Sequence, residues 1–238
     1  MEQRNIALNR SSQRKIRCVV AHPMPSLADL QKAREEFKRI EPRDFFYWSV
    51  TKLVSAVLEA ESRTASATPG MVDELVRVLM MLLTTWNKNY YRFFNSRHPG
   101  MTLEEHFSDL ETEIKKHFPS LIAFRGQRLY ETPDLPEHEI EAIFTDFADV
   151  LGRVGAAKCL HLLAPCFFPL WDAAILKGYG MEKAEYRNLT DAKRYLAFIG
   201  ISKAQIDSLG DFRAVTGNPL KALDEYNYCR FTKEVSFD

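Results

Sequence analysis

Apolar residues recur every three or four positions over most of this chain, a spacing that predicts amphipathic helices. The first two helices are expected to begin at Ser26 and Asp44, with Pro42 between them. The longest apolar stripe predicts a helix over residues 71–94. Strand-like alternation is almost absent, and residues 17–21 are its one brief candidate. The pattern therefore predicts an all-α fold.

Capping and helix-breaking residues divide the second half of the chain. Thr102 begins a capping box, and Pro119 is expected to end the helix that follows it. A further helix is expected over residues 137–151. Gly200 is expected to stop a later helix, and Ser202 to cap the next.

No internal repeat divides the chain, so residues 26–238 are read as a single helical domain, in two lobes with a cleft between them. Residues 1–25 form a locally basic arm. A solvated, flexible arm is the simpler interpretation of this segment, and a contact with phosphates is the alternative.

The composition narrows the class of protein. The chain has 238 residues, 46% of them hydrophobic, which is enough for a globular core. Its 32 basic and 32 acidic residues cancel, which argues against a general polyanion-binding surface but leaves room for a local basic groove. No run is apolar enough to span a membrane, and no signal peptide is visible, so we expect no membrane partner.

The four cysteines show no CxxC pairing, and no zinc or iron–sulfur spacing occurs. This pattern fits a reducing cytosol, and we expect a cytoplasmic protein with no metal and no cofactor. Phosphate-loop and zinc-peptidase motifs are also missing. The sequence does not define an oligomeric state, and a monomer is the simplest expectation. The cysteines are Cys18, Cys159, Cys166 and Cys229.

The stretch over residues 144–179 has the organisation of a site. A predicted helix runs into the glycine-bearing turn Gly152-Arg153-Val154-Gly155, and a small-residue helix is expected to start at about Ala156. Free N–H groups at such a start can bind a phosphate, and Arg153 adds a positive charge. An ordinary helix–helix turn is the competing interpretation.

Two further features follow the turn. Lys158 and His161 lie three residues apart and so share a face of the second helix. Asp172 follows an apolar run and precedes a helical segment, so it is a helix N-cap, a functional carboxylate, or both.

These residues resemble the helix-hairpin-helix DNA glycosylases, in which a hairpin of the type Leu-x-Gly-Val-Gly precedes a helix and an aspartate follows an apolar stretch. Leu151, Val154 and Gly155 match the hairpin, and Asp172 matches the acid. Arg153 stands where the family has a glycine. The usual lysine position holds Ala157, with Lys158 one residue later, and the run to the aspartate is short. The helix-hairpin-helix element would cover about residues 137–164.

The resemblance implies excision of a base after it is flipped out of double-stranded DNA. Asp172 would stabilise positive charge on the sugar and activate water. Lys158 would either attack the sugar, which adds lyase activity, or contact phosphate, which leaves a monofunctional enzyme; the displaced register favours the second. Gly152, Arg153, Gly155, Ala156 and His161 would form the DNA-contacting region.

Aromatic and polar residues near the expected cleft are candidates for a base pocket, although each is also a reasonable core residue. They are Trp86, Asn87, Tyr91 and Trp171. The sequence does not define the base. A bulky modified base, of the kind that marks some viral DNA, is one candidate, which would suit antiviral defence. Two alternatives stay open: a non-catalytic helix-hairpin-helix DNA-binding module, and a helical protein-interaction domain.

Overall fold

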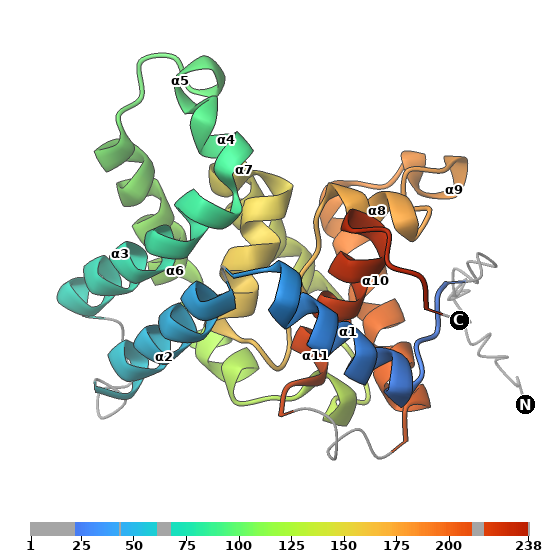
Figure 1. Cartoon of the computed structure of the whole chain (residues 1–238). Coiled ribbons are helices and arrows are strands. Elements are labelled where there is room, and N and C mark those ends of the chain that lie inside the picture. The colour runs from blue at the N-terminus through green and yellow to red at the C-terminus, as the bar shows by residue number, and fades with distance from the viewer. Residues whose placement is uncertain (1–21, 43, 61–67, 211–216, 238) are drawn as a thin grey trace, which may run out of the picture.

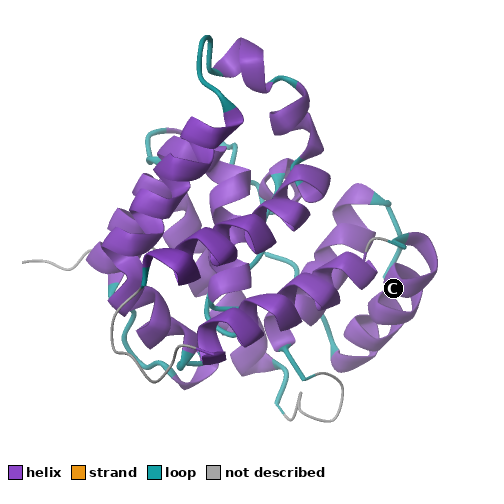
Figure 2. Ribbon diagram, turned by 90° about the vertical axis from the view of Figure 1, so that its left-hand side faces the viewer, coloured by secondary structure: helices purple, strands orange, loops and turns teal. Residues whose placement is uncertain are grey.

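The computed structural model describes residues 22–42, 44–60, 68–210 and 217–237. Within these ranges every regular element is a helix, so the all-α prediction is confirmed (Figure 2). Most of the basic arm and the strand candidate at residues 17–21 lie outside the described residues. None of the described helices has the length and apolar character of a membrane span.

The helices follow one another with short connections. In chain order they are α1 (Leu27–Ile40), α2 (Asp44–Ala60), α3 (Pro69–Trp86), α4 (Lys88–Arg92), α5 (Phe94–Arg97), α6 (Leu103–Arg125), the 3-10 turn η1 (Leu129–Glu131), α7 (Glu137–Leu163), α8 (Ala173–Gly178), α9 (Ala184–Arg187), α10 (Asp191–Ser208), α11 (Pro219–Asn227) and the π-helical turn η3 (Tyr228–Thr232).

Side-chain caps set the predicted helix starts. Ser26 and Asp29 form a complete capping box at α1, and Thr102 and Glu105 form another at α6. Thr68 caps α3, whose first residue is Pro69. The predicted starts at Ser26 and Thr102 are therefore confirmed.

Three predicted boundaries are wrong. The helix expected over residues 71–94 breaks at Asn87, whose backbone is not helical (φ −109°, ψ 38°). Pro119 lies inside α6 on its exposed side, and Lys115, whose carbonyl lacks a partner because proline has no N–H to donate, is also an exposed residue. Gly200 lies inside α10, and Ser202 is buried within the same helix and does not cap a new one, because residues on both sides of Gly200 form one continuous buried face.

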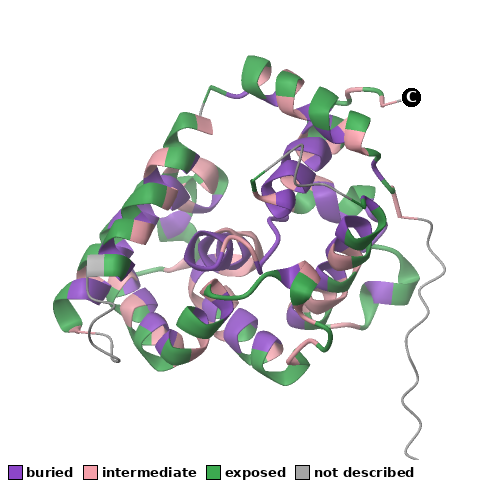
Figure 3. Cartoon of the chain, turned by 90° about the horizontal axis from the view of Figure 1, so that it is seen from below, coloured by how far each residue is buried: buried purple, intermediate pink, exposed green. Residues whose placement is uncertain are grey.

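Helix α7 is the centre of the fold, and Gly152 divides it into two helical runs. Gly152 alone is non-helical there (φ 67°, ψ 159°), so the break is one residue, not the four-residue turn that was predicted. The phenol of Tyr90 donates a hydrogen bond of 2.6 Å to the carbonyl of Val150 at the end of the first run. The second run is buried from Gly155 onward except at Lys158. Figure 3 shows how buried ribbon gathers at the middle of the molecule.

Two groups of helices flank α7 (Figure 1). On one side α2 packs on α3, α3 on α6, and α6 on α7. On the other side α1 packs on α11, α8 packs on η3, and α10 packs on α7. The first and the last α-helix of the described residues, α1 and α11, thus pack against each other.

We predict opposite effects for two glycine substitutions. Gly152→Ala should destabilise the protein by about 1–2 kcal/mol, because its φ of 67° is unfavourable for alanine and the added Cβ would lie 3.3 Å from Tyr90 Cε2. Gly200→Ala should stabilise it by about 0.5–1 kcal/mol, because this residue is helical and has open space beside it. Urea unfolding measures both free energies. Equal effects at the two positions would contradict the assigned break.

Candidate active site

A pocket of about 250 Å³ lies where α1, α3 and α11 meet the second run of α7 and the start of α8. One water occupies roughly 30 Å³ in the liquid, so the pocket has room for a small ring system. Lys158 and Asp172, the two predicted catalytic residues, both line it. Lys158 lies one residue later than the lysine of the helix-hairpin-helix DNA glycosylases, and its side chain nevertheless lines the same pocket as Asp172.

Asp172 is held rigidly at the pocket. It is the N-cap of α8, and its Oδ1 accepts a 2.9 Å hydrogen bond from the backbone N–H of Ile175. Its Oδ2 makes no hydrogen bond with the described residues and is left for a ligand or water. The carboxylate is both a cap and a wall of the pocket.

Lys158 reaches across to the end of α3. Its Nζ donates a 2.5 Å hydrogen bond to the carbonyl of Trp86, the last residue of that helix. A cation at a helix C-terminus is favourable, because the last carbonyls there lack partners within the helix. Lys158 therefore has a structural role in addition to lining the pocket.

Aromatic side chains form part of the wall. Trp86 stacks on Tyr47, with ring centroids 5.5 Å apart and planes 8° apart, so one of its faces is covered. Trp171 is 1% exposed, and its indole N–H donates a 3.1 Å hydrogen bond to the carbonyl of Arg153. Both tryptophans line the pocket, and Trp171 is at the same time a core residue.

Beneath the pocket lies a buried charge cluster. The ammonium of Lys221, 1% exposed, lies 3.4 Å from Asp44, 3.2 Å from Asp224 and 3.6 Å from Glu225. It also lies 4.1 Å from the ring centroid of Phe37. Asp224 belongs both to this cluster and to the pocket lining.

Burial and charge shift the pKa values of this cluster in definite directions. Burial raises the pKa of Asp224, and the nearby Asp172 carboxylate adds to that effect, against the opposing influence of Lys221 and Lys158. Burial raises the pKa of Glu225 to about 7. Burial disfavours the charge of Lys221, but its three carboxylates outweigh this and raise the pKa.

The predicted DNA-contacting residues divide into two groups. Gly152 and Arg153 are half-buried at the break in α7, and Arg153 Nη1 lies 3.4 Å from Asp191. Gly155, Ala156 and His161 are buried, so the prediction that they contact DNA does not fit this structure. Gly155 is a close-packing position instead: a Cβ there would lie 2.9 Å from the Asn87 amide nitrogen.

His161 is a core residue with both ring nitrogens in hydrogen bonds. Nδ1 lies 2.7 Å from the carbonyl of Phe168, which can only accept, so Nδ1 carries the proton. Nε2 then accepts from the hydroxyl of Tyr47 at 2.9 Å. Burial lowers the pKa of His161 to about 4.

Two predicted base-pocket residues lie elsewhere. Asn87 is the C-cap of α3 and packs on Gly155. The hydroxyl of Tyr91 lies 3.4 Å from His106 Nε2 and 3.5 Å from Met80 Sδ. Neither side chain is among those that line the pocket.

Sequence reasoning missed the contribution of the two ends of the chain. Phe37 and Glu41 from the end of α1, and Asp224 and Tyr228 from the end of the chain, line the pocket. The Tyr228 hydroxyl donates a 2.8 Å hydrogen bond to Glu41. The one signal was a charged group, Lys221 with Asp224 and Glu225, at helical spacing among apolar residues of a short helix.

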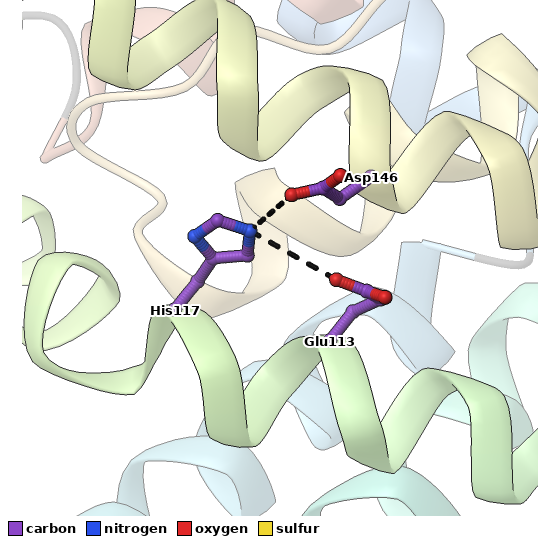
Figure 4. Close-up of side chains that lie close together, drawn as sticks. All are labelled: Glu113, His117 and Asp146. Atoms are coloured by element: carbon purple, nitrogen blue, oxygen red, sulfur yellow. Dashed lines mark hydrogen bonds and ion pairs between the residues drawn. The ribbon is translucent and has the colours of Figure 1, made fainter.

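A second polar cluster lies between α6 and α7 and does not line the pocket (Figure 4). His117 Nε2 is 2.6 Å from Asp146 and 3.9 Å from Glu113, and the three potential ligand atoms lie within 4.8 Å of one another. Lys116 Nζ, however, is 2.8 Å from Asp146 and 3.4 Å from Glu113. Since one ammonium group already pairs with both carboxylates, the cluster is read as an ion-pair network.

Comparison with known proteins gives no relative for this chain. No family model matches it, and no significant match is found among curated proteins or solved structures. The function must therefore be argued from the pocket itself.

We predict that His161 makes the protein sensitive to acid. The unfolded chain takes up a proton near pH 6.5 and the folded protein only near pH 4, so stability is lost as pH falls between these values. The loss due to His161 should reach about 3 kcal/mol, at roughly 1.4 kcal/mol per pH unit.

Urea unfolding at pH 7, 6, 5 and 4 measures this dependence. His161→Gln should be less stable at neutral pH and should show a shallower loss towards acid. His138→Gln, on the exposed start of α7, is the control and should keep the wild-type slope. An unchanged slope in His161→Gln would contradict the assignment.

Proposed function

We propose that this protein is a DNA N-glycosylase that hydrolyses the N-glycosidic bond of a damaged or modified base after flipping it out of the duplex. The observation that carries the proposal is the meeting of Asp172 and Lys158 in one aromatic-walled pocket of about 250 Å³. These residues come from separate elements, Lys158 from α7 and Asp172 from the N-cap of α8.

The chemistry follows from the position of Asp172. Breaking an N-glycosidic bond builds positive charge on the sugar, and a fixed carboxylate stabilises that charge. The N-cap hydrogen bond to Ile175 occupies Oδ1 and orients the group, and Oδ2 can activate the attacking water. Trp86 offers a ring against which a flipped base can stack.

The arrangement around α7 also supports DNA binding. We read the helices on either side of α7 as two lobes, with the pocket as the cleft between them. The two runs of α7 around Gly152 are then the helix-hairpin-helix element, and Gly152 and Arg153 are its contacts with the DNA backbone. When DNA binds, Arg153 would leave its ion pair with Asp191 and pair with a phosphate.

The substrate is proposed as a base with hydrogen-bond donors. Among the described lining residues, Glu41 and Asp172 place two carboxylates in the pocket, beside the carboxyl group of Asp224 and the ammonium of Lys158. Carboxylates accept hydrogen bonds from exocyclic amines or hydroxyl groups. Bulky hydroxylated bases of viral DNA therefore belong in the test panel, beside oxidised, alkylated, deaminated and mismatched bases.

Asp172→Asn should abolish base excision, with a loss of at least about 10²–10³-fold in rate, because it removes the charge and keeps a good N-cap. Purified protein is incubated with the DNA panel, and abasic sites are detected by alkali cleavage. Melting temperature and DNA affinity of the variant should stay close to wild type. Asp207→Asn, an exposed surface change on α10, is the control and should retain activity. Absence of abasic sites from wild type on every substrate would overturn the proposal.

A non-catalytic DNA-binding module is the second candidate, and a specific observation favours it. Asp172 already caps α8 and Lys158 already binds the end of α3, so each has a complete structural role. Salt-sensitive binding to duplex DNA, with no excision of any base and no effect of Asp172→Asn, would identify this function.

We predict a monofunctional enzyme. Lys158 Nζ donates to the Trp86 carbonyl at 2.5 Å, so this nitrogen is engaged with the end of α3 and not directed at a sugar. Borohydride should therefore trap no covalent protein–DNA adduct during excision. Lys158→Gln should keep excision activity while lowering stability by about 0.5–1 kcal/mol through the lost helix-end contact. A trapped adduct that disappears in Lys158→Gln would show that Lys158 is a nucleophile.

A further inference from the structure

A second carboxyl group faces the pocket beside Asp172. Asp224, on α11, lines the same pocket with a side chain 14% exposed. Lys221 Nζ donates to its Oδ2 at 3.2 Å, and within the described part of the chain Oδ1 has no hydrogen bond. Lys221 thus fixes Oδ2 of Asp224, and Oδ1 is left for a ligand.

The two carboxyl groups have different surroundings. Asp172 sits at the N-terminus of α8, where a backbone N–H and the helix dipole favour the anion. Asp224 is largely buried and shares Lys221 with Asp44 and Glu225, so three carboxylates compete for one ammonium. Such an arrangement favours a proton within the cluster, where burial raises the pKa of both Asp224 and Glu225, and Asp224 is the one of these two that lines the pocket. Two carboxyl groups whose surroundings differ in this way are suited to separate acid and base roles.

We infer that Asp224 is the general acid that protonates the departing base, paired with Asp172 as the general base for water. This inference rests on the proposed glycosylase function and assigns a second catalytic residue to it. In the hydrolysis of sugars, two carboxyl groups on either side of a glycosidic bond act in the same way, one as general acid and the other as general base.

The step balances as follows. The Asp224 carboxyl gives its proton to a nitrogen or oxygen of the base as the glycosidic bond breaks, and the electron pair of that bond leaves with the base. Asp172 takes a proton from the water whose oxygen bonds to the anomeric carbon of the sugar. The base leaves neutral, the sugar gains a hydroxyl group, and solvent returns the proton from Asp172 to Asp224, so one water is consumed.

The groups that surround Asp224 define its titration. Lys221 and Glu225 face it from α11, and Asp44 faces it from α2. Asp172 and Lys158 act on it from across the pocket, where Glu41 also lies. Variants must therefore leave these groups in place.

The test is the pH dependence of the single-turnover excision rate on the best substrate of the DNA panel. Wild type should lose activity as pH rises and Asp224 deprotonates. Asp224→Asn should lower the rate by about 10²–10⁴-fold and lose this alkaline decline, because a general acid contributes that much. Asp224→Glu should restore part of the rate and the decline. DNA affinity should remain within a few-fold of wild type in both variants.

Substrates with different leaving groups give a second readout. A duplex with N7-methylguanine carries its own positive charge on the base, so its excision should depend little on Asp224. The control is Asp207→Asn on the surface of α10.

Three results would overturn the inference. The first is an Asp224→Asn enzyme with the wild-type rate and pH profile. The second is an Asp224→Asn enzyme that is equally slow at all pH values and on all substrates, has a lowered melting temperature and is not rescued by glutamate. Such a result would mean that Asp224 acts only as a structural partner of Lys221. The third, no excision by wild type on any substrate, overturns the proposed function and this inference with it. The first two leave the proposed function standing.

Discussion

The break of α7 at Gly152 is the constraint on which the candidate site depends. A straight helix over residues 137–163 would carry its second run away from the place that it now occupies. The left-handed backbone at Gly152 redirects it, and Tyr90 and Trp171 secure the bend through hydrogen bonds to the carbonyls of Val150 and Arg153. The redirected run places Lys158 at the end of α3 and His161 in the core. One residue without a side chain therefore decides which groups of α7 face the pocket.

The site is built from side chains that have two tasks each. All three of Asp172, Lys158 and Asp224 line the pocket. Asp172 also caps α8, Lys158 also bonds the last carbonyl of α3, and Asp224 also pairs with the buried Lys221. Charges placed in this way are rigid, because each is already held by a partner from a known direction. The N-cap interpretation of Asp172 is confirmed, and because the same carboxylate lines the pocket, its functional interpretation stays a prediction.

The sequence predicted the helical class, the caps at Ser26 and Thr102 and the start of α8, since these follow from local spacing and local hydrogen bonds. It failed where tertiary contacts decide. Pro119 is accepted inside α6 because it lies on the exposed side of that helix, as does Lys115, whose carbonyl loses its partner. The helix predicted over residues 71–94 ends early, at Trp86, whose carbonyl accepts a hydrogen bond from Lys158. Asp224 could not be recognised, because nothing local indicates that α11 folds back against α1.

The packing of α11 on α1 has a consequence for the order in which the protein folds during synthesis. The pocket takes walls from Phe37 and Glu41 near one end of the chain and from Asp224 and Tyr228 near the other. During synthesis the helices around α3, α6 and α7 can pack as they emerge, but the pocket stays open until α11 and η3 have left the ribosome. A nascent chain that lacks these two elements would hold Asp172 and Lys158 in an unfinished cavity, so any chemistry of the pocket would wait until they are in place.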